Sequence, residues 1–406
     1  MSGVLEGVKV VELAIWVAGP SAAGVLSDWG ADVVKVEAPG GDPMRNVYGA
    51  IGLSELIPNA PFIFNNRGKR SLELDLHTDD GKEAMRRLLA EADVMLTNMR
   101  PEALGRMGLD HETVMAEHPH LVYCTSTGYG LTGPEKDRAG YDVAAFFGRS
   151  GFAHQITLPG EGAITSRSAI GDNTTGITSV AGILAALHQK NRTGKGQVVE
   201  ASLLRTGMWV IGGDLGTQEI LGKIRQPDPR AENSTPLVNS YQSQDGRWFY
   251  LIGVEAKRHY PGLMKAIGRD DLLDDERFQT AQDLVKNRRA MIEVLDAAFS
   301  SQPMEHWKQI FDELDVWWAP IQSPGEVLED PQAEAVGAFI ATRDMSGNEV
   351  RSVNSPINFH GHEFRESDPP PELGEHTEDV LRELGFSDEE LAAMQESGAI
   401  SRPESS

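Results

Sequence analysis

The sequence predicts an α/β fold with a parallel sheet, and three observations lead to that prediction. Short β-branched segments recur through the first half of the chain, at residues 8–13, 32–37, 71–76, 93–97, 121–126 and 197–203. Segments with helical apolar spacing separate most of them, and glycine or proline ends several. A strand, a helix and a second strand in succession form the βαβ unit of a parallel sheet. Repetition of this unit predicts a sheet with helices on both faces.

The spacing of apolar residues predicts the helices between these strands. Residues 22–29, 79–92 and 101–107 are expected to be helical. The strongest helix begins at Asp172 and ends near Asn191, because its apolar residues recur at intervals of three and four. In the last segment of the chain, Ser387 precedes three acidic residues, which is typical of a capped helix start within 376–397.

Shifts in composition divide the chain into domains. Residues 1–221 form the predicted large domain, and residues 222–235 are polar and proline-containing, as in a linker. Residues 236–320 contain a hairpin with Asp245-Gly246 at its turn, followed by helices, and predict a smaller α+β domain. Residues 321–406 are expected to form a second linker and an acidic C-terminal segment.

Charge and composition exclude several classes of function. The chain has 406 residues, 37 basic and 61 acidic side chains, and a net charge of −24. This charge argues against nucleic acid and against an anionic membrane surface as partners. Residues 323–406 contribute 5 basic and 19 acidic side chains, so the first half remains able to host an anion site. The single cysteine, Cys124, and the lack of a long apolar run favour the cytoplasm.

Nucleotide and metal motifs are incomplete in this sequence. Gly19 and Gly24 have the glycine spacing of a P-loop, but Val25-Leu26 replaces its Lys-Ser/Thr, and no GxGxxG is present. The histidine pairs 118/120 and 360/362 lack further ligands at metal-binding spacing, so no metal is expected.

Asp172 is the candidate reactive residue. As the predicted N-cap of the strongest helix it could simply cap backbone N–H groups. The helix end also favours its anionic form, and a carboxylate can attack an activated acyl group. The adjacent Gly171 would allow a substrate to approach closely. Basic residues in predicted loops could together hold a phosphorylated ligand, or each could be an ordinary surface charge: Lys69, Arg70, Arg100, Arg106 and Arg138.

Five stretches, in order and spacing, resemble the class III CoA-transferases of the CaiB/BaiF type, which include formyl-CoA transferase, carnitine CoA-transferase and the 2-methylacyl-CoA racemases. The stretches cover nearly the whole chain and read LEGVKVVEL…AGP…LSDWGADVVKVE, NRGKRSLELDL, ADVMLTNMRPEALGRMGL, GYGLTGP…DRAGYD and GDNTTGITSVAGILAAL…NRTGKGQVVEASL. The tail GEHTEDVLRELGF is also typical of the family.

The resemblance assigns roles residue by residue. Asp172 falls on the family's catalytic aspartate. Residues that match positions contacting CoA in relatives are Val17, Ala18, Leu74, Asn98, Met99, Arg106, Tyr141 and, one residue from a family lysine, Arg138. Ala38 stands where some relatives carry an arginine that stacks on adenine. CoA and acyl-CoA are implied as substrates, with no permanently bound cofactor.

The resemblance also implies a reaction. A transferase moves CoA from an acyl-CoA donor to a free carboxylic acid through an aspartyl anhydride and an aspartyl-CoA thioester. Racemases of the family use a histidine base where this chain has Tyr141, and a phenol is a poor base at neutral pH, so a transferase is favoured. A racemase or epimerase and a non-catalytic CoA-binding protein remain alternatives.

The expected acid is of medium size, with a 2-hydroxy, aryl or branched chain, because the glycine-rich loop of formyl-CoA transferase has no counterpart here. Phe146, Phe147 and Phe152 could line an acyl pocket or could equally be helix core. The family's architecture implies a Rossmann-like large domain, a small α+β domain, a C-terminal segment that returns to the large domain, and a homodimer of interlocked rings.

Overall fold

The computed structural model describes residues 3–53, 57–164, 166, 169–224, 226–361 and 367–401. The chain divides into two compact units. The larger unit comprises Met1–Ala153, Thr165–Lys223 and Gln332–Ser406, and the smaller comprises His154–Ile164 and Ile224–Pro331. Each unit is described separately below.

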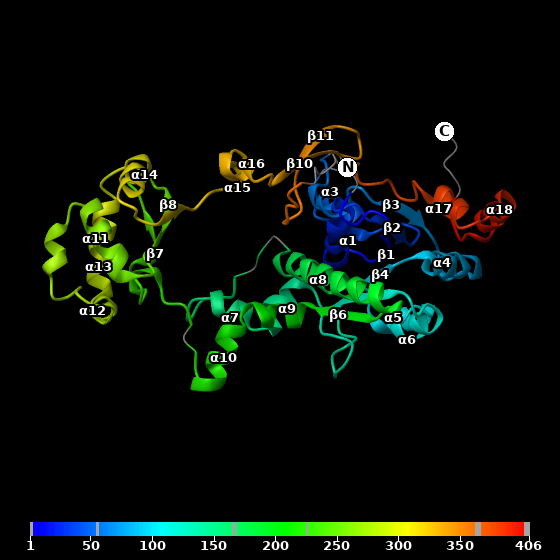
Figure 1. Ribbon diagram of the computed structural model, residues 1–406, viewed down its shortest axis with the longest axis horizontal. Helices are drawn as coiled ribbons and strands as arrows, with labels where there is room; N and C mark the ends of the chain where they lie inside the picture. The colour runs from blue at the N-terminus through cyan, green and yellow to red at the C-terminus, as the bar shows by residue number, and fades with distance from the viewer. Residues whose placement is uncertain are drawn as a thin grey trace. The chain divides into compact units, whose positions relative to one another are not determined.

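A parallel sheet forms the centre of the larger unit. Within the described residues it has six strands in the order β3-β2-β1-β4-β5-β6 (Figure 1). Their bounds are β1 Lys9–Leu13, β2 Asp32–Glu37, β3 Arg70–Glu73, β4 Val94–Thr97, β5 Val122–Thr127 and β6 Val198–Ser202. Every neighbouring pair is parallel, with Val10 opposite Val33 and Val94. This arrangement confirms the predicted α/β class.

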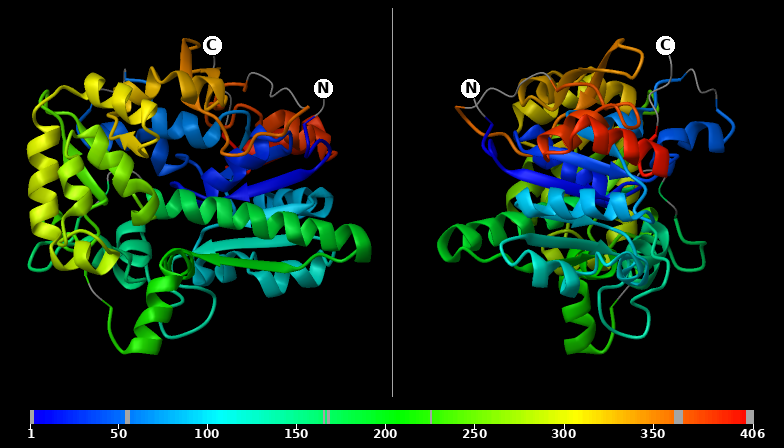
Figure 2. Two further views of the ribbon diagram at one scale, coloured as in Figure 1. Left: turned by 60° about the vertical axis from the view of Figure 1, so that its left-hand side comes forward. Right: turned by 90° about the vertical axis from the view of Figure 1, so that its right-hand side faces the viewer.

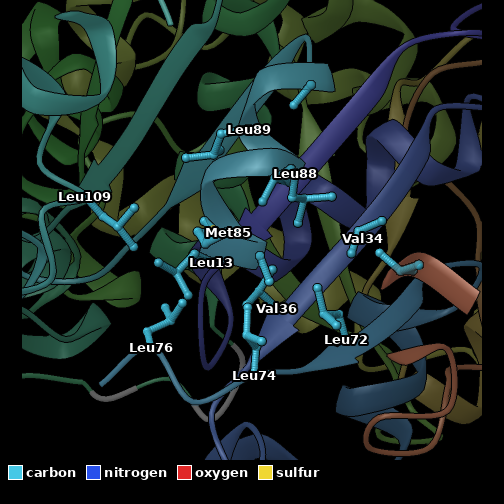
Figure 3. Packing of buried hydrophobic residues seen from close by; sticks show 14 of the residues in the cluster. Leu13, Val34, Val36, Leu72, Leu74, Leu76, Met85, Leu88, Leu89 and Leu109 are labelled. Carbon is cyan, nitrogen blue, oxygen red and sulfur yellow. The ribbon is translucent and has the colours of Figure 1, made fainter. Parts of the chain in front are cut away.

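Successive residues of the strands pack alternately into two separate hydrophobic cores, one on each face of the sheet, as expected for a sheet covered on both faces. Val10 and Val33 pack with Ala22 of α1 (Ala18–Asp28) and Ile183 of α8 (Ile170–Thr193). The alternate residues, such as Val34, face the other core, which α4 (Asp79–Glu91), α17 (Thr377–Glu383) and α18 (Asp388–Ser397) help to cover. Figure 3 shows side chains of this second core, and Figure 2 shows α8 lying along the sheet.

The predicted helices are found, several of them with shifted ends. The helix expected at 22–29 begins at Ala18 instead, and the one expected from Asp172 begins at Ile170. Ser387 caps α18 as predicted, with Glu390 completing a capping box. The remaining helices of the larger unit are α2 Val47–Ala50, α3 Ala60–Asn66, α5 Pro101–Met107, α6 His111–Glu117, α7 Phe152–Ile156, whose last residues belong to the smaller unit, α9 Leu203–Val210, α10 Gly212–Leu221 and α16 Pro331–Ala335.

Two features of the larger unit were not expected. A hairpin of β10 (Phe339–Arg343) and β11 (Glu349–Val353) forms a separate antiparallel sheet. Residues Asp142–Arg149 form a π-helix, a geometry frequently associated with functional sites. No helix in the described part of the chain combines the length and apolar character needed to cross a membrane.

The smaller unit has its own core. Its antiparallel sheet has the order β7-β8-β9, and Gly246, at positive φ, lies in the predicted turn between β7 and β8. Phe249, Phe299 and Phe311 pack edge-on at the centre of that core. The bounds are β7 Val238–Gln242, β8 Trp248–Ile252, β9 Trp318–Pro320, α11 Ala256–Ala266, α12 Ala281–Lys286, α13 Arg288–Phe299, α14 Met304–Glu313 and α15 Pro324–Leu328.

Candidate active site

Asp172 lies in the first turn of α8, whose N-cap is Ala169. The prediction that Asp172 itself is the N-cap is therefore wrong, because the helix begins before it. Its backbone N–H donates a 3.1 Å hydrogen bond to the Asp142 carboxylate, and the N–H of Gly171 donates to the same group. Asp142 opens the π-helix, so this irregular helix supplies the carboxylate that receives the first N–H groups of α8.

Gly171 is required by this contact and not by a substrate. A Cβ at position 171 would collide with the Asp142 carboxylate and with the ring of Phe146. The expectation that Gly171 gives a substrate access to the backbone is corrected, because protein atoms already fill that space.

Burial raises the pKa of both carboxyl groups at this site. Burial, and secondarily the neighbouring charge of Asp142, raises the pKa of Asp172 to about 7. Burial also raises the pKa of Asp142, although the two N–H donors oppose this effect. The expectation that the helix end keeps Asp172 anionic at neutral pH is thus corrected, because the effect of burial on its pKa outweighs that of the helix end. A carboxyl whose pKa lies near neutrality in a buried position is typical of a reactive residue.

Three N–H groups in the first turn of α8 are not free to stabilise the oxyanion of a tetrahedral intermediate. The N–H groups of Gly171 and Asp172 point to Asp142, and the N–H of Asn173 donates to the carbonyl of Ala169. These donors are already satisfied. Any donor to a developing oxyanion must come from other groups.

The β1–α1 turn brings three of the predicted CoA-contacting residues together. Val17 is the N-cap of α1 and Ala18 its first residue. Asn98, just after β4, holds the turn at Ile15: the Ile15 N–H donates to its side-chain oxygen at 3.0 Å, and its amide donates back to the Ile15 carbonyl at 2.6 Å. The Ala18 carbonyl lies close to Gly176 of α8, one turn beyond Asp172.

Leu74 and Met99 differ in what they can offer a ligand. Leu74 is 1% exposed within the core beneath the sheet edge (Figure 3), so its side chain packs there. Met99 is partly buried and packs against the same core. The Leu74 side chain therefore has almost no surface to offer a ligand, whereas Met99 keeps some exposed area.

Arg106, Arg138 and Tyr141 are exposed. Arg106 in α5 forms a 2.7 Å ion pair with Glu102, and Arg138 forms one of the same length with Glu135. The N–H of Glu102 also donates to Asp137, which brings the loop containing Arg138 to the start of α5. An anionic ligand could therefore reach either arginine, but it would compete with the neighbouring glutamate for the guanidinium group.

Lys69 and Arg70 are not positioned to hold a phosphorylated ligand. Lys69 is 3% exposed and bonds to Glu12 and to the Pro20 carbonyl. Arg70 forms ion pairs with Asp32 and Glu383. The expectation that these two join the phosphate-binding set is corrected.

Phe146, Phe147 and Phe152 form a small aromatic core. Their ring centroids lie 5.2–5.6 Å apart, and Phe146 and Phe147 are almost completely buried. This packing favours helix core over an acyl pocket. In the described part of the chain, no group of three or more potential metal ligands occurs.

Asp142 is the functional candidate that the sequence interpretation missed. The stretch Gly140-Tyr141-Asp142 drew attention to its tyrosine, although the acid beside it contacts Asp172. The available signal was a second acidic residue next to a family motif.

Comparisons with known proteins identify the family of this chain. The model of CoA-transferase family III matches residues 5–377. The (R)-2-hydroxy-4-methylpentanoate CoA-transferase of Clostridioides difficile is 32% identical over 98% of this chain and 99% of that protein. The succinate–glutarate CoA-transferase of Agrobacterium fabrum is 34% identical over 94% of this chain and 95% of its own.

A solved structure supports the fold as well. A CaiB/BaiF family protein from Brucella suis superposes with a TM-score of 0.83 and 33% identity, covering 95% of this chain and all of that one. The chain therefore belongs to CoA-transferase family III and is a CoA-transferase.

Proposed function

We propose that this enzyme transfers CoA from an acyl-CoA to a free carboxylic acid through covalent intermediates on Asp172. The observation that supports this most strongly is the Asp172 carboxyl, mostly buried, next to Asp142, with its pKa raised to about 7. When ionised, such a carboxylate is poorly solvated and a better nucleophile than an ordinary aspartate.

The reaction proceeds in four acyl-transfer steps. The Asp172 carboxylate attacks the thioester carbonyl of the donor, the C–S bond breaks, and CoA leaves as its thiolate while a mixed anhydride forms. The thiolate attacks the aspartyl carbonyl and releases the donor acid. The acceptor carboxylate attacks the resulting aspartyl thioester and expels the thiolate. The thiolate then takes the new acyl group, which regenerates the Asp172 carboxylate.

CoA binds beside the β1–α1 turn in this proposal. Val17, Ala18, Asn98 and Met99 contact the thiol-bearing arm, and Leu74 supports this surface from the core. The exposed residues Arg106, Arg138 and Tyr141 complete the set, and the two arginines offer positive charge to the phosphates. CoA and acyl-CoA act as substrates, and no cofactor remains permanently bound.

The acceptor is a 2-hydroxy, aryl or branched acid of medium size. The relative from Clostridioides difficile acts on a branched 2-hydroxy acid, which supports this class. The relative from Agrobacterium fabrum acts on dicarboxylates, so a matrix of donors and acceptors must include both classes.

A homodimer is part of the proposal. A groove of about 830 Å³ runs beside α8 and α9 in the larger unit, lined by Ile177, Ala181 and Trp209 among others. Trp209 and Ile220 are each 82% exposed. A groove with an exposed tryptophan on its wall, and a further exposed isoleucine on the following helix, are features typical of a protein interface. Light scattering should give a mass of twice 44.2 kDa, and a monomer would remove this part of the proposal.

Trapping the intermediate tests the mechanism. The protein is incubated with succinyl-CoA, then separately with 2-hydroxy-4-methylpentanoyl-CoA, each with hydroxylamine, and digested for mass spectrometry. We expect an aspartyl hydroxamate at Asp172. Asp142→Asn, which keeps a carbonyl oxygen beside the nucleophile, serves as the positive control for peptide recovery. Turnover without any modification of Asp172 contradicts the covalent mechanism.

A further inference from the structure

Four ionisable side chains are buried together beside the β1–α1 turn. Glu12 lies in β1, Lys35 in β2, Asp42 after β2 and Lys69 before β3, and none is more than 3% exposed. The strand register places Glu12 opposite Lys35. The two oxygens of Glu12 lie 2.8 Å from Lys35 Nζ and 2.6 Å from Lys69 Nζ, and Asp42 lies 2.9 Å from Lys35 Nζ. The charges of two carboxylates and two ammonium groups therefore balance. We call these four residues the buried ion cluster.

The buried ion cluster also holds the backbone of the turn. Lys35 Nζ donates to the Ala14 carbonyl at 2.9 Å, and Lys69 Nζ donates to the Pro20 carbonyl at 3.0 Å. The Trp16 N–H donates to Asp42 at 3.0 Å. Hydrogen bonds from the cluster thus reach both ends and the middle of residues 14–20.

The conformation held in this way is not one that the chain adopts freely. Trp16 has a φ of 65°, a left-handed value that is unfavourable for a bulky residue. Such a conformation persists only where surrounding groups determine it. The hydrogen bond from Trp16 to Asp42 is one of these determinants, and Asn98 fixes the preceding residue, Ile15.

Stability alone does not explain four buried charges. Desolvation offsets most of the attraction in a buried ion pair, so well-packed apolar side chains of similar size give comparable stability. Apolar side chains, however, cannot direct hydrogen bonds to Ala14, Trp16 and Pro20. The distinctive effect of the cluster is the placement of this backbone.

We propose that Glu12, Lys35, Asp42 and Lys69 are positioning residues for acyl-CoA, which they serve by fixing the turn that contains Val17 and Ala18. The inference rests on the proposed function, because only there does this turn contact CoA. None of the four touches the reacting atoms. Loosening the turn should weaken binding of CoA while leaving the chemistry at Asp172 largely intact.

A double substitution tests this proposal without stranding a charge. In Glu12→Gln/Lys69→Met, Lys35 and Asp42 still balance, whereas the hydrogen bond to the Pro20 carbonyl is lost. We expect the Kd for CoA, measured by calorimetry, and the KM for acyl-CoA each to rise about tenfold. We expect kcat and the KM for the acceptor acid to change less than about twofold.

A matched control removes a similar pair far from the turn. Lys190 near the end of α8 lies 2.6 Å from Asp93, which precedes β4 at the amino ends of the strands, whereas the turn follows the carboxyl end of β1; this pair is partly exposed. Asp93→Asn/Lys190→Met should keep the parental affinity for CoA. A folded Glu12→Gln/Lys69→Met protein with parental affinity for CoA overturns the proposal.

A second comparison covers the case in which the double variant does not fold. Asp42→Asn keeps an acceptor for the Trp16 N–H, whereas Asp42→Ala removes it. Asp42→Ala should raise the KM for acyl-CoA more than Asp42→Asn does, and equal KM values overturn the positioning role. The parent protein is titrated first: if it binds no CoA, the proposed function itself fails, whereas binding by the parent with no effect of these variants contradicts only this inference.

Discussion

The larger unit contains two sets of buried acidic groups that are arranged in opposite ways. In the buried ion cluster, Glu12 lies between two lysines and Asp42 contacts one of them. At the start of α8, Asp172 and Asp142 instead lie next to each other. Glu12 and Asp42 are fully buried and the α8 pair is partly buried, so the two sets differ in depth as well as in the charge of their neighbours.

The consequence appears in the proton affinities. Glu37, which adjoins the buried ion cluster, is also buried, and burial raises its pKa, but Arg45 and Lys35 lower it to about 2. Burial and Asp142 both raise the pKa of Asp172, to about 7. Opposite charges beside the buried Glu37 carboxyl therefore keep it ionised, whereas a like charge beside Asp172 adds to the effect of burial and favours its protonated form.

Asp172→Asn should produce the largest change in activity. Loss of the nucleophile should lower kcat by about four orders of magnitude or more. The same variant should be more stable than the parent above pH 7, by up to about 4 kcal/mol, because the folded parent must then ionise a mostly buried group. An acid whose folded pKa is raised loses stability as pH rises from about 4 to about 7, so the advantage should shrink as pH falls through this window.

Thermal melts at pH 5 and pH 8, together with rate assays, check both parts of this prediction. Asp79→Asn is the matched control, because Asp79 also lies in the first turn of a helix but is fully exposed. It should change stability by less than about 0.5 kcal/mol. If the difference in stability between Asp172→Asn and the parent did not change with pH, the pKa of Asp172 would not be raised in the folded protein.

Lys35→Met should cause the largest loss of stability, because it leaves Glu12 and Asp42 buried without their shared cation. We expect about 3–5 kcal/mol, measured by urea unfolding. Lys9→Met is the control, since Lys9 pairs with Glu91 at about half exposure and should cost less than about 1 kcal/mol. Similar losses for the two variants would remove the distinction between balanced buried charges and surface pairs.

Asp142→Asn should remove the like charge beside Asp172 without supplying an opposite one. Removal of the neighbouring charge lowers the pKa of Asp172, so more of it is ionised below neutrality. The acidic limb of the pH profile of kcat/KM should therefore move to lower pH. When each profile is divided by its own plateau value, the variant should be a few-fold more active than the parent at pH 6. An unchanged limb would mean that burial alone sets this pKa. The control is Asp137→Asn, because Asp137 lies in the same segment, between β5 and the π-helix, and accepts a hydrogen bond from the Glu102 N–H.

Much of the fold could be predicted, because it depends on local patterns. Parallel strands and helices leave clear signatures in the spacing of apolar residues, and the helix Pro101–Met107 was predicted with its observed bounds. The π-helix at Asp142–Arg149 was not predicted, because an inserted residue has no distinctive composition. The start of α8 was misplaced because Asp172 looks like a cap, whereas the first N–H groups are received by Asp142, thirty residues earlier.

The site was predictable where a residue acts alone and not where it acts through a partner. Asp172 follows from a motif, but its proton affinity depends on burial and on Asp142. Lys69 looked like a surface cation, because no local pattern indicates that Glu12 receives it inside the fold. Leu74 likewise matched a binding position, although its side chain packs in the core.

Arg106→Ala should have the smallest effect and extends the comparison to charges in water. The Arg106 side chain is 66% exposed and pairs with Glu102, so water and salt screen its attraction for a CoA phosphate and the glutamate weakens it. We expect the Kd for CoA to rise about threefold at low ionic strength and hardly at all at 0.5 M salt. Arg86→Ala on α4, whose guanidinium pairs with Glu83 in a similar way, is the control and should leave the Kd unchanged. If Arg106→Ala also leaves it unchanged at low salt, Arg106 lies outside the CoA site, and the phosphates are held by other groups such as Arg138.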